Sequence, residues 1–266
     1  MEIFGQENQK PAKEIIRPIH RGIWADRLDN AQELPLGGSL FSNELTLKLE
    51  LDFSAFDEQF GSFTEENIKK AYEHSKDSIR DWLEKIGSDI DPYTYFVCWQ
   101  VQQRMHKLLE VDQNASAVKI SIERKKMYGQ QKPPKISELK GKTECGERAA
   151  MGQYLLQRIG VESAYVSGIT MQDVKDIDEY PENHSFIVLK HPTKTDSTLI
   201  FDIARLRSQQ VPRVLETDIP FTYELLKEKD ELLVGATEVL QGGRLWFGVG
   251  EPVAGQHKTI EKNKQE

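Results

Sequence analysis

Three residues in this sequence have the types and the order that nucleophilic chemistry needs: Cys145, His184 and Asp202. Cys145 lies within residues 141–150, in or just before the first turn of an expected helix. The positive end of a helix dipole and its unpaired N–H groups favour a thiolate over a thiol. The same N–H groups stabilise an oxyanion that forms on a carbonyl attacked by the sulfur. The sequence therefore predicts a nucleophilic sulfur at a helix start.

One helix and two strands must position these side chains. Gly160 is the expected stop of the helix. His184 opens an apolar run that extends to residue 189, and Asp202 closes a second run at residues 198–201, so both runs are predicted to be strands. The order is nucleophile on a helix, base on a strand and carboxylate on the next strand. The apolar side of the helix carries Ala149, Met151, Tyr154, Leu155 and Ile159.

Each of the three residue types has its own role in acyl transfer from an amide. The reaction needs a nucleophile, a base that takes its proton and returns it to the leaving amine, and a group that orients the base. A carboxylate hydrogen-bonded to an imidazole favours imidazolium, and imidazolium lowers the pKa of a neighbouring thiol. Asp202 lies between Phe201 and Ile203, where an unpaired carboxylate would be costly to bury. We therefore expect Cys145 and His184 to form a thiolate–imidazolium pair oriented by Asp202.

This order and spacing resemble the papain/transglutaminase-like superfamily of cysteine enzymes, and the transglutaminase core more closely. His184 follows Cys145 by 39 positions, and Asp202 follows His184 by 18, which suits a compact helix–strand–strand core. The resemblance covers residues 144–205. One departure is that Cys145 is followed by Gly146 and a polar helix start, whereas papain carries a glycine-rich, aromatic-flanked segment around its cysteine. The resemblance implies a protease, a glutamine deamidase, an amidase or a transglutaminase.

Some neighbouring residues compete for the same roles. His191 could act in place of His184, although it precedes Pro192 in an expected turn. Asp196 could act in place of Asp202, although it lies at an expected hairpin tip. Asn183 is a further polar candidate.

The side chain that would assist the oxyanion stays open. The backbone N–H of Cys145 is the natural first donor. Transglutaminases add an upstream aromatic donor, a role that Trp99 or Tyr128 could fill. Papain-like enzymes add an upstream glutamine, but the glutamines before Cys145 are not at papain's short separation; they are Gln100, Gln102, Gln103, Gln130 and Gln131.

The two cysteines of the chain differ in their neighbours. Cys98 follows Val97 and precedes Trp99 and Val101, so it is predicted to be a buried core residue with a raised thiol pKa. The neighbours of Cys145 are not core types, which favours exposure; they are Glu144, Gly146, Glu147 and Arg148. Two cysteines are too few for a disulfide framework.

Composition excludes several function classes. The net charge of −8 at pH 7 argues against nonspecific binding of nucleic acid. The cysteines and histidines lack zinc-ligand spacing, and no phosphate-binding glycine loop is present, so no metal or cofactor is predicted. No apolar run approaches the roughly 20 residues that span a bilayer. With no secretory signal at the start, the default compartment is the cytoplasm, unless a secretion system that needs no such signal exports the protein.

Other segments have clear local patterns. Residues 44–51 alternate as a half-buried strand, and residues 62–65 match a capping box before a helix that ends at Gly87. A second helix begins at Pro92, after Asp91. The remaining expectations are helices near Pro18, a short strand at residues 118–122, a solvated charge run at residues 124–126, a loop at residues 173–183 and a hairpin turning at residues 241–243.

These patterns predict an α+β fold in which a helical N-terminal region packs with an antiparallel sheet bearing His184 and Asp202, and the Cys145 helix lies against that sheet. The expected organisation is an N-terminal extension with one strand at 1–60, a helical region at 61–130, a catalytic core at 131–255 and a tail at 256–266, with 61–255 as one compact unit.

The function hypothesis is cysteine-dependent acyl transfer on the amide of a protein or peptide through a thioester, with water as the acceptor. Bacterial effector-type enzymes are similar in carrying such a triad behind a variable helical region. Two alternatives are a transglutaminase, with an amine as acceptor, and a binding or scaffold protein with a vestigial triad.

Overall fold

The computed structural model describes residues 23–36, 47–111, 117–128, 132–173, 182–203, 212–217, 233–240 and 243–248. Before and including the Cys145 helix these residues form helices and three short strands, and after that helix they form strands. The helices are α1 (Asp57–Phe60), α2 (Glu65–Lys85), α3 (Pro92–Leu108), α4 (Ala117–Tyr128) and α5 (Cys145–Arg158), with 3-10 turns η1 (Phe53–Phe56) and η2 (Ile136–Leu139). The strands are β1 (Ile23–Ala25), β2 (Glu33–Leu36), β3 (Leu47–Glu50), β4 (Ser163–Asp173), β5 (Glu182–Lys190), β6 (Thr198–Asp202), β7 (Arg213–Thr217), β8 (Leu233–Leu240) and β9 (Gly243–Gly248).

The main sheet has the strand order β7-β6-β5-β4-β9-β8, and all its pairings are antiparallel. Strand β4 is the long central element: β5 lies along one side, and β1 and then β9 lie along the other. Strand β8 approaches β7, so the two ends of the sheet curl toward each other. Strands β2 and β3 form a separate two-stranded sheet. The described residues thus confirm the α+β class.

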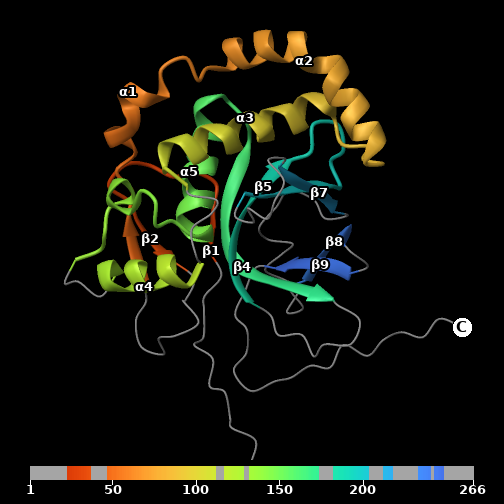
Figure 1. Cartoon of the computed structure of the whole chain (residues 1–266). Helices are drawn as coiled ribbons and strands as arrows, with labels where there is room; N and C mark the ends of the chain where they lie inside the picture. The colour runs from red at the N-terminus through yellow and green to blue at the C-terminus, as the bar shows by residue number, and fades with distance from the viewer. Residues whose placement is uncertain are drawn as a thin grey trace, which may run out of the picture.

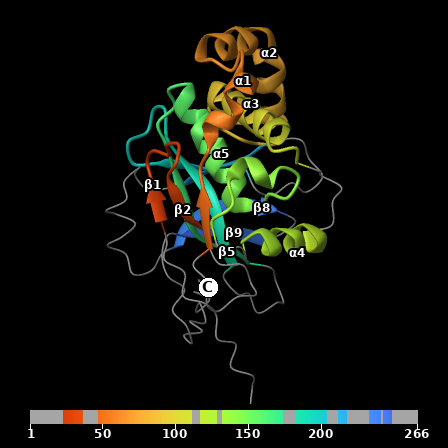
Figure 2. The same ribbon diagram turned by 90° about the vertical axis from the view of Figure 1, so that its left-hand side faces the viewer.

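The helices cover the sheet in layers. Helix α5 packs on β4 and β5, α3 packs on α5, and α2 packs on α3. Figures 1 and 2 show this order from two sides, with α2 farthest from the sheet and α4 outside this stack of three helices. Helix α5 is therefore enclosed between α3 and the strands that carry the other two predicted site residues.

Helices α2 and α3 begin and end at the signals their sequences contain. The Thr64 side chain caps α2 by accepting the Asn67 N–H, so the cap lies two residues after the expected Ser62. Gly87, with φ of 66°, follows the end of α2 as expected. Asp91 caps α3 by accepting the Thr94 N–H at 2.8 Å, and proline takes the first helical position.

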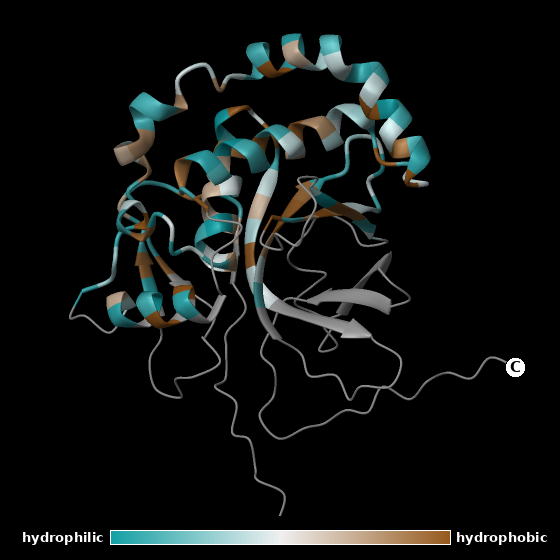
Figure 3. Ribbon diagram, viewed as in Figure 1, coloured by the Kyte–Doolittle hydropathy of each residue, from teal (hydrophilic) through white to brown (hydrophobic). Residues whose placement is uncertain are grey.

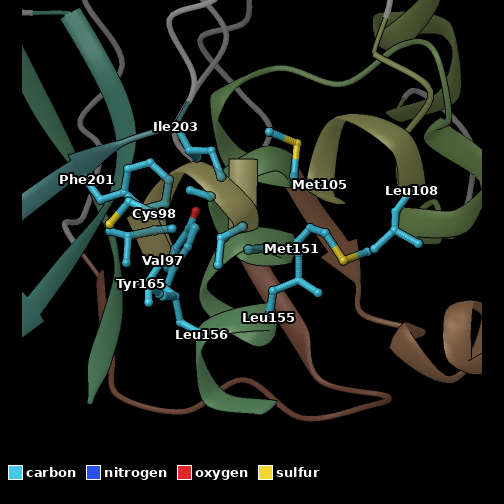
Figure 4. Close-up of a cluster of buried hydrophobic side chains, with 14 of the residues drawn as sticks. Val97, Cys98, Met105, Leu108, Met151, Leu155, Leu156, Tyr165, Phe201 and Ile203 are labelled. Atoms are coloured by element: carbon cyan, nitrogen blue, oxygen red, sulfur yellow. The ribbon is translucent and has the colours of Figure 1, made fainter. Parts of the chain in front are cut away.

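The core lies between α3, α5 and the main sheet. Figure 4 shows Cys98 among side chains of these elements, beside Phe201. Cys98 is 0% exposed, which confirms the prediction of a buried core cysteine. In Figure 3 the hydropathy of α2 and α4 varies along each helix, whereas β5 is mostly hydrophobic. Helix α2 is therefore an outer layer and β5 an inner one.

The predicted strand at residues 118–122 is wrong, because the structure has helix α4 there. Ile120, Arg124 and Tyr128 are spaced four apart and are all buried, whereas Ile122 is 51% exposed. A three-residue alternation cannot tell a strand from a helix, and here the helical period decides which side is buried. The charge run was expected to be solvated, but Arg124 is only 5% exposed.

The remaining expectations concern the two ends of the chain. Residues 1–60, for which one strand is expected, contain three described strands, and β1 joins the main sheet. The hairpin of β8 and β9 is confirmed. Strand β4 extends to Asp173 and β5 begins at Glu182, so both ends of the expected loop belong to strands, and residues 174–181 lie outside the described part. The helices near Pro18 and the tail at 256–266 also lie outside it. Among the described residues, no helix is long and apolar enough to cross a membrane.

Candidate active site

Cys145 is the first residue of α5, at the helix start that the sequence predicts. The Glu144 N–H donates to the Glu147 carboxylate at 3.0 Å, which caps the helix from within its own first turn. Cys145 is partly buried. Its polar neighbours favoured exposure of Cys145, yet two of them are themselves buried, with Glu147 0% and Arg148 8% exposed. Both are charged groups that hydrogen bonds and ion pairs compensate, which is how charges become tolerable inside a protein.

His184 and Asp202 lie on the neighbouring strands β5 and β6 and are joined by a hydrogen bond. The His184 Nε2 is 2.9 Å from the Asp202 Oδ1. The two residues are 7% and 2% exposed. The imidazole also packs over the Phe186 ring, two residues along the same strand, with ring centroids 6.2 Å apart. The base is therefore held by a carboxylate at one edge and by a ring at its face.

The structure brings Cys145 to this pair. Hydrogen bonding to the His184 side chain and to the Ser185 backbone is among the causes that lower the pKa of the Cys145 thiol. Because Nε2 is taken by Asp202, Nδ1 is the ring nitrogen left for the sulfur. Burial acts to raise the pKa of the Cys145 thiol, but the bonds and charge of His184, the Ser185 amide and the Arg124 charge outweigh it and lower that pKa.

The pKa of His184 moves in the opposite direction. Burial acts to lower it, but the charge and hydrogen bond of Asp202, followed by those of Cys145, outweigh this and raise the pKa to about 10. A lowered thiol pKa and a raised imidazole pKa both favour transfer of the proton from the sulfur to the ring. The site therefore favours a thiolate–imidazolium pair with a buried carboxylate behind it.

Arg213 is a site residue that the sequence did not suggest. It faces Asp202 directly across strands β6 and β7, and its Nη1 is 3.4 Å from the Asp202 Oδ2. One carboxylate oxygen of Asp202 thus contacts His184 and the other contacts Arg213. The signal that could have found Arg213 is its cross-strand register, which depends on how two distant segments pair.

A second polar pair lies on the β4 side of the site. The Tyr165 hydroxyl is 3.0 Å from the Ser185 Oγ, and both residues are buried. Burial raises the pKa of Tyr165, and the Cys145 charge adds to this. The phenol is therefore neutral and fixes the side chain of Ser185, whose backbone hydrogen bond helps to lower the pKa of the Cys145 thiol.

The competing candidates lie elsewhere or have other partners. His191 is held in its turn, where its Nδ1 accepts the Thr193 and Lys194 N–H groups at 3.2 and 3.0 Å. Asp196 is exposed on the β5–β6 turn. The side chain of Asn183 lies outside the described part. Tyr128 donates its hydroxyl to Glu147 at 2.6 Å.

Trp99 remains the other aromatic candidate for the oxyanion. Its ring packs edge-on against Phe96 in α3, and its indole Nε1 is buried without a hydrogen-bond partner. Among the upstream glutamines, Gln102 is buried in α3, whereas Gln130 and Gln131 lie outside the described residues.

In the described part of the chain, no three His, Cys, Asp or Glu side chains gather as a metal site would require. Comparisons with protein families, with curated proteins and with solved structures find no match to this chain.

Proposed function

We propose that this protein is a cysteine enzyme that transfers the acyl group of a protein or peptide amide to water through a thioester on Cys145. The observation that carries the proposal is the buried His184–Asp202 hydrogen bond, together with the coupling of the same imidazole to the Cys145 thiol, whose pKa it lowers. In the resulting charge state the sulfur is nucleophilic and the ring can donate a proton. Neither property is needed for packing a core.

The first half of the reaction would form the thioester. The Cys145 thiolate attacks the amide carbonyl carbon, and the carbonyl oxygen becomes an oxyanion to which the Cys145 backbone N–H can donate a hydrogen bond at the helix start. The imidazolium of His184 gives its proton to the leaving nitrogen, the carbon–nitrogen bond breaks, and the amine departs. Asp202 keeps the ring oriented while its charge changes.

The second half would release the acid. Neutral His184 takes a proton from water, the hydroxide oxygen attacks the thioester carbon, and the carbon–sulfur bond breaks to restore the thiolate and the imidazolium. An amine in place of water would give transglutamination by the same steps, and the donor amide could be a glutamine side chain or a peptide bond. We favour water as the acceptor.

We infer a transglutaminase/papain-like core from the same residues. The support is the chain order, with the nucleophile opening α5, the base on β5 and the acid on β6. The polar helix start after Cys145 departs from the segment that papain carries. An effector-type role is an analogy of architecture only: helices α2 and α3 precede the core in the chain, as a variable helical region does in such enzymes.

The function is tested with two probe substrates, dimethylated casein and a glutamine-containing peptide, followed by mass spectrometry. The reaction expected is hydrolysis, seen as new chain ends or as glutamine converted to glutamate, with an acyl group trapped on Cys145 after rapid acid quenching. Cys145→Ala and His184→Ala should both lose product. Product formation that survives in Cys145→Ala would overturn the proposal.

A scaffold protein would behave differently toward an electrophile. In that case iodoacetamide would label Cys145 with the pH profile of an ordinary thiol, whose pKa is about 8.5, and His184→Ala would leave the profile unchanged.

A further inference from the structure

Helix α4 reaches the candidate site through one buried carboxylate. Glu147, in the first turn of α5, is 0% exposed. Its Oε1 accepts from the Arg124 guanidinium at 2.8 Å and from the Tyr128 hydroxyl at 2.6 Å. Its Oε2 accepts the Glu144 N–H at 3.0 Å. Both oxygens are therefore satisfied, as a fully buried carboxylate requires.

The two α4 side chains act from one face of their helix. Arg124 and Tyr128 are four residues apart, so they lie one above the other, and the guanidinium sits 4.8 Å from the centroid of the phenol ring. Arg124 also pairs with Glu144 at 3.0 Å. Helix α4 is thus attached at two neighbouring positions to the residues that flank Cys145.

The attachment also sets the charges around the sulfur. Arg124 faces the sulfur from α4. The start of α5 contributes Glu144, Glu147 and Arg148. The Arg148 guanidinium donates to the Thr143 carbonyl at 2.6 Å. From the sheet the ionisable groups are those of His184, Asp202 and Tyr165, with Arg213 behind Asp202. Two guanidinium groups thus balance two carboxylates at the helix start. Without Arg124, only Arg148 would face the two carboxylates, and one uncompensated negative charge would remain near the thiolate.

We propose that Arg124 and Tyr128 are positioning residues for Cys145, and that docking of α4 on Glu147 regulates the nucleophile by fixing the first turn of α5 and keeping a positive charge beside the sulfur. The proposal rests on the proposed function, because it takes Cys145 as the nucleophile. It goes beyond that function because helix α4, which lies outside the helix–strand–strand core, would help to set the position and the pKa of Cys145.

The test compares full-length variants by the pH dependence of Cys145 alkylation with iodoacetamide, located by peptide mapping. Arg124→Gln should move the midpoint upward by about 1 pH unit, since an opposite charge at this range shifts a pKa by about that much. Alkylation below the midpoint then slows about tenfold. Arg124→Lys should recover part of the shift, and Tyr128→Phe should move the midpoint in the same direction by less.

Lys126→Gln is the matched control. Lys126 is exposed on the same helix, so its loss removes one positive charge without touching Glu147, and the midpoint should stay at the wild-type value. Circular dichroism establishes that each variant is folded. If Arg124→Gln unfolds the protein, Tyr128→Phe carries the test, because it keeps the ring and removes one hydrogen bond.

Two outcomes separate this inference from the proposed function. The inference would be overturned if folded Arg124→Gln kept the wild-type midpoint of alkylation. If Arg124→Gln unfolds, an unchanged midpoint in Tyr128→Phe would overturn it instead. In either case, a shifted midpoint in His184→Ala would leave the proposed function standing. An ordinary thiol profile that His184→Ala does not change would overturn both.

Discussion

Helix α3 and the candidate site each hold one cysteine and one histidine, and the pKa values of the two pairs move in opposite directions. In α3, burial raises the pKa of Cys98, and burial together with the Arg148 charge lowers the pKa of His106 to about 4. At the site the pKa of Cys145 is lowered and that of His184 is raised. The two shifts therefore favour the neutral forms of Cys98 and His106 and the charged forms of Cys145 and His184.

Burial alone does not explain the difference, because it disfavours the charged form of all four groups. The partners decide. Among the described residues, no charged group contributes to the pKa of Cys98, whereas the Cys145 thiol has an imidazole as its partner and His184 has a carboxylate at 2.9 Å. The same two residue types are thus core material in one region and groups coupled by their charges in the other.

The largest expected effect is the difference in turnover between variants of the two cysteines. Cys145→Ala should lower turnover of the probe peptide about 10⁴-fold or more, because the nucleophile is removed. Cys98→Ala should keep turnover and lower the free energy of unfolding by about 1 to 2 kcal/mol, since it only leaves a small cavity. Turnover and urea unfolding of both variants check this. Equal turnover loss in the two variants would contradict it.

The next effect concerns the acid behind the base. Asp202→Asn keeps the shape of the side chain but removes the charge that favours imidazolium, so kcat should fall about 10³-fold. The loss of turnover should far exceed the loss of stability measured by urea unfolding of the same variant. If unfolding of Asp202→Asn accounted for the whole loss of turnover, Asp202 would be structural.

A smaller effect tests the packing that both regions share. A Cβ at Gly152 of α5 would lie 2.7 Å from the Ile203 Cδ1 and 2.9 Å from the Ile187 Cδ1. Overpacking typically costs 1 to 3 kcal/mol and alanine gains about 1 kcal/mol in helix propensity, so Gly152→Ala should be destabilising by about 1 kcal/mol. Urea unfolding measures it, and a stabilised variant would contradict the close packing of α5 on the sheet.

The smallest effect is a pH dependence that comes from α3. Because the pKa of His106 is lowered from 6.5 to about 4 in the folded state, the unfolded chain binds more protons between these values. The contribution of His106 to the free energy of unfolding is therefore greatest above pH 6.5. It falls as the pH drops from 6.5 to about 4, by about 1 kcal/mol after solvent screening. His106→Gln should flatten this loss, whereas His74→Gln, at an exposed position, should not. Equal pH dependence in wild type and His106→Gln would contradict it.

Local signals in the sequence were enough to predict the elements that carry the site. The cysteine at a helix start, Gly160 after that helix and the two apolar runs each report on a few neighbouring residues, and α5, β5 and β6 lie where these signals predict. The α+β class and the buried state of Cys98 follow from similar short-range patterns.

The residues that the sequence did not reveal depend on contacts between distant segments. Arg213 meets Asp202 only through the register of β6 with β7, and Glu147 is buried only because α4 supplies Arg124 and Tyr128. The charge run at residues 124–126 was predicted to be solvated because its sequence does not show that Arg124 pairs with Glu147. The strand predicted for residues 118–122 is wrong for a related reason. The buried face of helix α4 is polar at Arg124, so the short apolar alternation was the clearer pattern in the sequence.

The most direct test of the charged pair is the ultraviolet absorbance of the Cys145 thiolate as a function of pH, taken as the difference between wild type and Cys145→Ala. The account predicts that thiolate absorbance persists well below pH 7, and that in His184→Ala it appears only near the ordinary thiol pKa of about 8.5. A wild-type thiolate that appears only near pH 8.5, with the same midpoint in His184→Ala, would contradict it.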